Sequence, residues 1–134
     1  MKTKRIALEA EFGAETRFEL QPVDAFRAIR EQLGDPEVLL YNAGSGTFGA
    51  ITEITPDHYE ADWRVNAFGA FVAAKEVAPG MIARGHGTIL FTGATAGVKA
   101  GPKSVSFGPA KFAMRGLAQT LLSVTASVER EFID

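Results

Sequence analysis

The chain has 134 residues, of which 46% are hydrophobic and 22% are charged, which suits one globular domain with its own core. With a net charge of −2, no membrane-length apolar run and no signal peptide, we expect a cytoplasmic protein with no nucleic-acid or membrane partner. Cysteine is absent and the two histidines, His58 and His86, have no second ligand at metal spacing, so we expect no disulfide, thiolate or metal site.

The first 20 residues allow two interpretations. Residues 5–8 could begin a strand, or residues 6–12 could form a helix that closes at Gly13. Residues 17–20 alternate polar and apolar side chains, which favours a short strand.

The first clear helix begins at Pro22, because a proline in the first helical turn loses no hydrogen bond. Its apolar residues fall three or four positions apart and form one stripe: Val23, Phe26, Ile29 and Leu33. Gly34 is expected to end this helix in the usual way. Residues 38–41 then form a nearly all-apolar strand, which is typical of a strand covered by helices on both faces.

A second helix is predicted over residues 56–77. Thr55 can cap it, Pro56 suits the first helical position, and the Asp57 carboxylate complements the helix dipole. Pro79 and Gly80 are expected to disturb its end, and residues 81–84 could add a turn.

Residues 88–92 form the next predicted strand, and a final helix is predicted from about Pro109 past Leu122. Four of its residues are available for packing: Phe112, Leu117, Leu121 and Val124. The alternation of helices and strands predicts an α/β fold with a parallel sheet. Small-residue loops follow both strands, at 42–46 and 93–101, and ligands bind beyond the carboxyl ends of strands in such sheets.

Four motifs stand in order along the chain: Asn42-Ala43-Gly44, Asn66 in a helix, the strand and glycine of residues 87–93, and Lys111. With them the chain resembles a short-chain dehydrogenase/reductase over about residues 22–130. The resemblance implies a Rossmann-like, doubly wound parallel sheet in three α/β/α layers, formed as a single domain over residues 1–134.

The resemblance also implies a chemistry, namely hydride transfer between NADP or NAD and a small-molecule carbonyl or alcohol. In the family, the lysine at the position of Lys111 binds the nicotinamide ribose and lowers the pKa of a catalytic tyrosine. The asparagine at the position of Asn66 supports a water-linked proton path. The residues that match the cofactor-lining motifs are Asn42, Ala43, Gly44, Thr92, Gly93 and Lys111.

Both reacting positions depart from the family pattern. Phe107 stands at the tyrosine position and Ala94 at the serine position, so the catalytic set would be Asn66, Lys111 and these two replaced positions. A phenyl ring has no proton to exchange, and a methyl group cannot orient a carbonyl. Hydroxyls lie nearby in sequence, at Thr92, Thr95, Ser104 and Ser106. The alternative interpretation is therefore a catalytically impaired member that acts as a nucleotide-binding or protein-interaction module.

A glycine-rich turn for a pyrophosphate is expected after the first strand of this fold, but residues 9–12 are Glu-Ala-Glu-Phe instead. The family also continues through two more strands beyond the helix that carries Lys111. We therefore expect the sequence to be incomplete at the nucleotide-binding turn and at the C-terminus.

The family resemblance further implies a homodimer or homotetramer through the helices at 56–77 and 109–128. Candidate residues for this surface are Phe68, Phe71, Phe112 and Leu117, and Trp63 lies at helical spacing from the first two, which suits packing or an interface. Their spacing is equally that of an ordinary core stripe.

Overall fold

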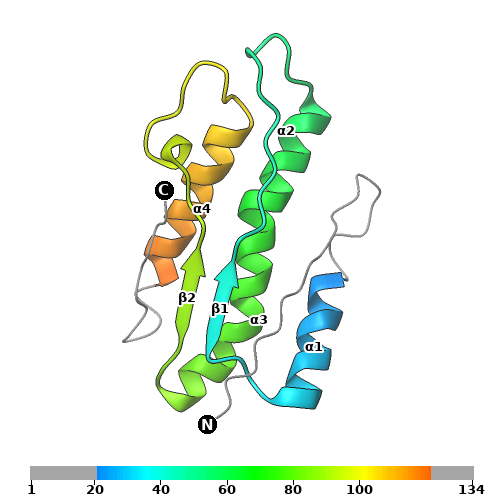
Figure 1. Cartoon of the computed structure of the whole chain (residues 1–134), viewed down its shortest axis with the longest axis vertical. Helices are drawn as coiled ribbons and strands as arrows, with labels where there is room; N and C mark the ends of the chain where they lie inside the picture. The colour runs from blue at the N-terminus through cyan, green and yellow to red at the C-terminus, as the bar shows by residue number, and fades with distance from the viewer. Residues whose placement is uncertain (1–20, 122–134) are drawn as a thin grey trace.

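The computed structural model describes residues 21–121, in which helices and strands alternate as the sequence predicts (Figure 1). The elements are α1 (Gln21–Leu33), β1 (Val38–Tyr41), α2 (Pro56–Trp63), the π-helical turn η1 (Arg64–Phe68), α3 (Gly69–Arg84), β2 (Thr88–Phe91), the 3₁₀ turn η2 (Thr95–Gly97) and α4 (Phe107–Leu121). The predictions for residues 1–20 and for Val124 lie outside the described residues.

The two strands pair in parallel, with Val38 opposite Thr88 and Tyr41 opposite Phe91. This arrangement confirms the α/β prediction. It also places the carboxyl ends of both strands at the same end of the molecule, where the small-residue loops begin (Figure 1).

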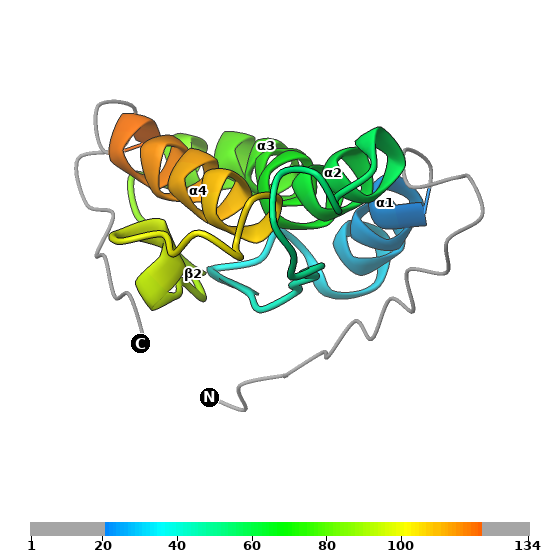
Figure 2. The same cartoon turned by 90° about the horizontal axis from the view of Figure 1, so that it is seen from above.

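Within residues 21–121, helices cover one face of this sheet. Seen from above, α2, α3 and α4 lie on one side of the strands, and α1 packs beside α3 (Figure 2). Side chains alternate along a strand, so Tyr41 and Phe91 are buried against the helices while Val38 and Leu40 are 59% and 58% exposed. The helices of residues 21–121 thus lie on the face opposite Val38 and Leu40 (Figure 2).

The core lies between the strands and the helices. It combines small residues of α3, which bring that helix close to the sheet, with a few large side chains: Phe26, Tyr41, Ala70, Ala73, Ala74, Val77, Met81, Ile89, Phe91, Met114 and Ala118.

α1 ends as its sequence predicts, because Gly34 adopts a φ of 85° and its N–H donates to Arg30 O at 3.0 Å. The Arg30 guanidinium then joins α1 to α3 through the Glu76 carboxylate at 3.0 Å. No helix within residues 21–121 is both long enough and apolar enough to cross a bilayer.

The second helical segment begins as predicted but ends later. Thr55 Oγ1 accepts a hydrogen bond from the His58 N–H at 3.2 Å, which confirms the cap. The predicted end near Val77 is wrong, because the helix continues through Pro79 to Arg84. A proline inside a helix costs about 3 kcal/mol, but the buried Val77 and Met81 on either side of it keep one packing face in the core.

α4 begins at Phe107, two residues earlier than predicted. Its buried stripe is formed by Ala110, Met114 and Ala118, with Leu117 and Leu121 partly buried beside them. Phe112 is 43% exposed, so it packs little against the core and stays a candidate for a surface between subunits.

Candidate functional site

The residues that follow β1 and β2 form a shared edge at the carboxyl end of the sheet. Asn42 follows β1 and Thr92 follows β2, and the Thr92 hydroxyl donates to Asn42 Oδ1 at 2.6 Å. Asn42 and Gly44 are exposed, whereas Ala43 is partly buried and packs against the core. The two motifs that the sequence places at strand ends are thus adjacent in space.

Lys111 reaches this edge from the second turn of α4. Its side chain is buried, and its Nζ donates to Thr92 O at 3.0 Å. The Nζ also lies 5.5 Å from the centroid of the Phe107 ring, one helical turn earlier. Burial lowers the pKa of the Lys111 ammonium. An ammonium has three N–H donors, so donors remain for a ligand beside the one given to Thr92.

Asn66 reaches the same edge from η1 and is fully buried. Its Nδ2 donates to Ser45 O at 2.6 Å and to Asp62 O at 2.8 Å. Its Oδ1 has no hydrogen-bond partner within the described part of the chain. A Cβ on Gly44 would lie 3.6 Å from this Oδ1 and 3.7 Å from Lys111 Nζ. An unpartnered acceptor and a cation therefore converge at one backbone position.

The π-helical turn is what distinguishes the helix around Asn66. The Gly69 N–H donates to Arg64 O, the i→i+5 bond of a π-turn. The Tyr41 hydroxyl at the end of β1 donates to Val65 O at 2.5 Å, and burial raises the pKa of that hydroxyl. β1 is thus tied to the turn that carries Asn66. Such turns occur frequently at functional sites.

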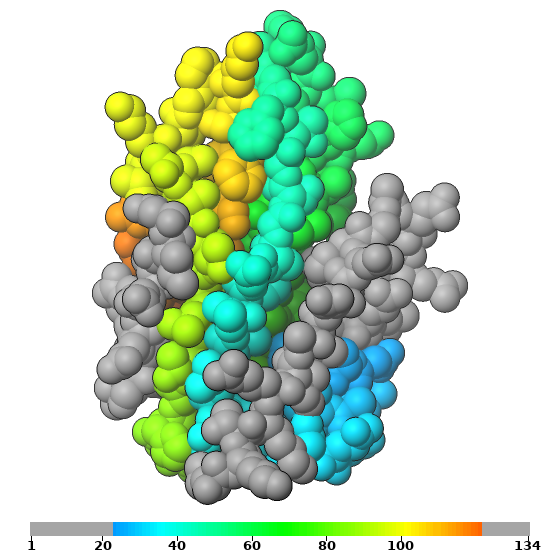
Figure 3. Space-filling view, viewed as in Figure 1, coloured from blue at the N-terminus to red at the C-terminus, as the bar shows by residue number. Residues whose placement is uncertain are grey.

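Phe107 occupies an apolar part of the site. Its ring packs against Gly46, where a Cβ would lie 2.9 Å from Phe107 Cδ2. The exposed ring of Phe48 lies 5.5 Å from it, centroid to centroid. In the space-filling view, the loop after β1 lies against the start of α4 (Figure 3). No hydroxyl is present on either ring.

Gly93 and Ala94 follow β2 directly and are partly exposed. Ala94 has extended backbone and precedes η2, where a Cβ on Gly97 would lie 3.2 Å from Lys111 O. The structure therefore brings Asn42, Thr92, Lys111 and Phe107 together by direct contacts and places Asn66 and Lys111 beside Gly44. Ala94 stands at the entrance to the turn that packs on α4.

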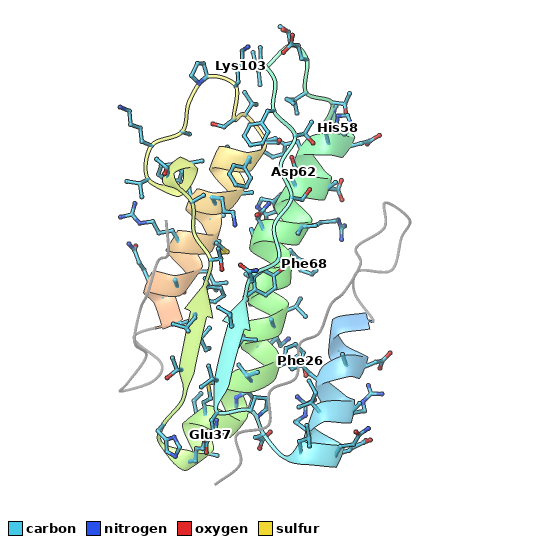
Figure 4. All side chains as sticks on the ribbon, viewed as in Figure 1. Phe26, Glu37, His58, Asp62, Phe68 and Lys103 are labelled. Atoms are coloured by element: carbon cyan, nitrogen blue, oxygen red, sulfur yellow. The ribbon has the colours of Figure 1, made fainter. Side chains whose placement is uncertain are left out.

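A buried carboxylate, not predicted from the sequence, lies beside these residues. Asp62 is 1% exposed and lies on α2, where the helix meets the loop after β1 (Figure 4). It accepts hydrogen bonds from Ser45 Oγ at 2.7 Å, Thr47 N at 2.7 Å and Ser106 Oγ at 2.6 Å. Burial alone raises the pKa of Asp62, but these hydrogen bonds outweigh burial and hold the pKa below its ordinary value.

A signal for Asp62 was present in the sequence. It stands four residues before Asn66, so the two residues share one helix face. A carboxylate on the face that carries a site residue is a candidate for burial beside that residue.

Comparisons with known proteins agree with this geometry. The family described as short chain dehydrogenase matches residues 12–128. The chain is 36% identical over 96 residues to the 3-ketodihydrosphingosine reductase of Dictyostelium discoideum. This match covers 70% of this chain and 29% of that protein.

Solved structures similar to the chain include two dehydrogenases. One is a gluconate 5-dehydrogenase from Burkholderia cenocepacia in complex with NADP and tartrate, with a TM-score of 0.76, 29% identity, and coverage of 81% of this chain and 44% of that chain. The other is an NAD⁺-bound xylitol dehydrogenase, with a TM-score of 0.72, 28% identity, and coverage of 77% and 40%. The chain thus spans less than half the length of each of these three proteins. From the family match, the strand-end motifs and the sheet on which they stand, the chain belongs to the short-chain dehydrogenase/reductase family.

Proposed function

We propose that the protein is an oxidoreductase that transfers hydride between NADP or NAD and a small-molecule carbonyl or alcohol. The observation that carries this proposal is the convergence of Lys111 Nζ and Asn66 Oδ1 at Gly44. Relatives support it, since one similar structure holds NADP, another holds NAD⁺, and a similar curated protein is a reductase.

The described residues fit a nicotinamide ribose. A ribose hydroxyl accepts hydrogen bonds, and the Lys111 ammonium keeps donors beyond the one that it gives to Thr92 O. We assign cofactor lining to the strand-end residues: Asn42, Ala43, Gly44, Thr92 and Gly93. The bound nicotinamide would supply or accept the hydride.

Proton transfer to the substrate oxygen then needs a source other than residues 94 and 107. We propose a water molecule held by Asn66 Oδ1 and the Lys111 ammonium, because these two groups supply an acceptor and a donor next to Gly44. Phe48 and Phe107 form an apolar wall beside it, which favours a substrate with an apolar substituent.

Titration of the full-length protein with NADPH and NADH is expected to give saturable thermal stabilisation and a matching fluorescence change. A ligand at 100 times its Kd stabilises the folded state by about 2.7 kcal/mol, which a melting curve resolves. Binding without turnover of any carbonyl or alcohol would favour the nucleotide-binding module. A folded protein that responds to neither cofactor would contradict the proposal.

We also propose a homodimer or homotetramer formed through α2, α3 and α4. Three aromatic side chains on these helices are exposed, namely Trp63 at 40%, Phe71 at 46% and Phe112 at 43%. Trp63 stacks on Phe68, with ring centroids 6.0 Å apart. Their exposure favours an interface over the core stripe that their spacing equally allows.

Light scattering of the full-length protein is expected to give two or four times the mass of one chain. Phe71→Glu should reduce that mass to one chain, because it places a charge within the aromatic surface. Leu33→Glu is the matched control, since Leu33 is a similarly exposed apolar residue on α1 (40%). A wild-type protein that is monomeric at micromolar concentration would refute the interface.

A further inference from the structure

The buried carboxylate of Asp62 lies where three segments of the chain meet. Ser45 and Thr47 belong to the loop after β1, Ser106 immediately precedes α4, and Asp62 itself lies on α2. Both carboxylate oxygens are used, Oδ1 by Ser45 and Oδ2 by Thr47 and Ser106. One side chain therefore connects the loop after β1 to the start of α4.

The donors to Asp62 are all neutral groups within residues 21–121. A buried carboxylate is unfavourable unless hydrogen bonds compensate for its lost hydration, and here three donors do so. The Ser106 hydroxyl also lies 2.8 Å from Thr47 O. Since a hydroxyl has one proton, it donates either to Asp62 or to Thr47. The first alternative holds the start of α4 to Asp62, and the second holds it to the loop after β1.

Asp62 joins the loop after β1 to the start of α4, and these two segments form the two walls of the candidate site. Ser45 is adjacent in sequence to Gly44, where Asn66 Oδ1 and Lys111 Nζ converge. Ser106 is adjacent to Phe107, whose helix carries Lys111. Any loosening of the contacts at Asp62 would change the spacing between these walls.

We propose that Asp62 is a positioning residue that fixes the loop after β1 and the start of α4 at the separation the cofactor requires. This inference rests on the proposed function, because the separation matters only if a cofactor binds between the two walls. The Asp62 carboxylate acts through Ser45, Thr47 and Ser106.

Asp62→Asn tests this role at nearly constant size. It removes the charge and replaces one acceptor oxygen by an NH2 group, which faces groups that donate to Asp62 in the wild type. At least one of these hydrogen bonds is therefore lost. Glu60→Gln is the matched control, because Glu60 lies on the same helix two residues earlier with its side chain 63% exposed. Both variants change the net charge by the same amount.

Cofactor affinity, measured at a temperature where each variant is fully folded, is the deciding measurement. Asp62→Asn is expected to weaken binding of NADPH or NADH by roughly tenfold, since hydrogen bonds to a charged group are the strong ones. Glu60→Gln should stay within about twofold of the wild type. A lower Tm with unchanged affinity would show a role in stability alone and would overturn the proposal.

Ser45→Ala and Ser106→Ala test the positioning role of Asp62 even if Asp62→Asn does not fold. The two serines lie on opposite walls and share Asp62 as acceptor. Each substitution should weaken binding about two- to fivefold, and the double variant should lose less than the product of the two. Fully multiplicative losses, or no loss at all, would refute a shared connection through Asp62.

Amide exchange without cofactor separates a failure of this inference from a failure of the proposed function. If the wild type binds neither cofactor, the proposed function is wrong. Ser106→Ala is expected to raise the exchange of the Thr47 amide, which lies across the connection. Faster exchange confined to the start of α4 would show that the two walls are not joined.

Discussion

Phe107→Tyr combined with Ala94→Ser is expected to raise NAD(P)H-dependent carbonyl reduction by about 100-fold or more, the range that a positioned general acid supplies. The new phenol would lie one helical turn before Lys111, whose Nζ is 5.5 Å from the present ring centroid. A neighbouring cation lowers the pKa of a phenol and prepares it to exchange a proton near neutral pH. Initial rates of NADPH and NADH oxidation with a panel of carbonyl compounds measure the gain.

Phe48→Tyr is the matched control for this experiment. The Phe48 and Phe107 ring centroids lie 5.5 Å apart, but Phe48 is 65% exposed. The substitution therefore adds the same phenol hydroxyl at a more exposed position. No gain is expected from it. If the double variant binds cofactor as the wild type does and its rate of carbonyl reduction is unchanged, the missing general acid is not what limits that rate.

Lys111→Met is expected to weaken cofactor binding by about tenfold or more while leaving the Tm unchanged or higher. Lys111 is 5% exposed, and the described partners of its ammonium are Thr92 O and the Phe107 ring. Burying a charge with few partners is unfavourable, and methionine fills a similar volume without that charge. Lys111 would thus favour cofactor binding while lowering the free energy of unfolding.

The pH dependence of the Lys111→Met effect follows from the lowered pKa of Lys111. A lysine whose pKa is lower in the folded state destabilises that state fully at pH values below the lowered pKa. This penalty disappears as the pH rises through the ordinary lysine value. Any stability gain of Lys111→Met should therefore be largest below the lowered pKa of Lys111 and vanish as the pH rises through the ordinary lysine value.

Thermal melts across this pH range and cofactor titrations check both halves of the prediction. Lys99→Met is the control, because Lys99 is exposed in the loop after η2, and it should change neither Tm nor affinity. A stability loss in Lys111→Met would mean that the hydrogen bond to Thr92 O outweighs the burial of the charge.

Local signals in the sequence predicted much of the fold. The Thr55 cap and the left-handed glycine after α1 depend only on residues nearby in the sequence, so both can be predicted without the tertiary structure. The order of helices and strands predicted the parallel sheet, and the sheet in turn placed the motifs at 42–44 and 92–93 side by side.

Features that depend on distant packing were not predictable in this way. The helix passes Pro79 because Val77 and Met81 are held in a core formed by other elements. Asp62 is buried because donors arrive from residues 17 and 44 positions away. The exposure of Val38 and Leu40 depends on which elements cover the sheet, which the strand sequence itself does not contain.

The π-turn at Arg64–Phe68 has a consequence for how this helix tolerates changes in length. A π-turn is equivalent to one extra residue inserted in an α-helix, and each residue rotates a helix by about 100°. Deleting one residue within Arg64–Phe68 would turn this segment into ordinary α-helix while the flanking faces of α2 and α3 kept their phase. Deleting one residue elsewhere between Pro56 and Arg84 would turn one packed face away from its partners. Length variation among related sequences should therefore concentrate at this turn.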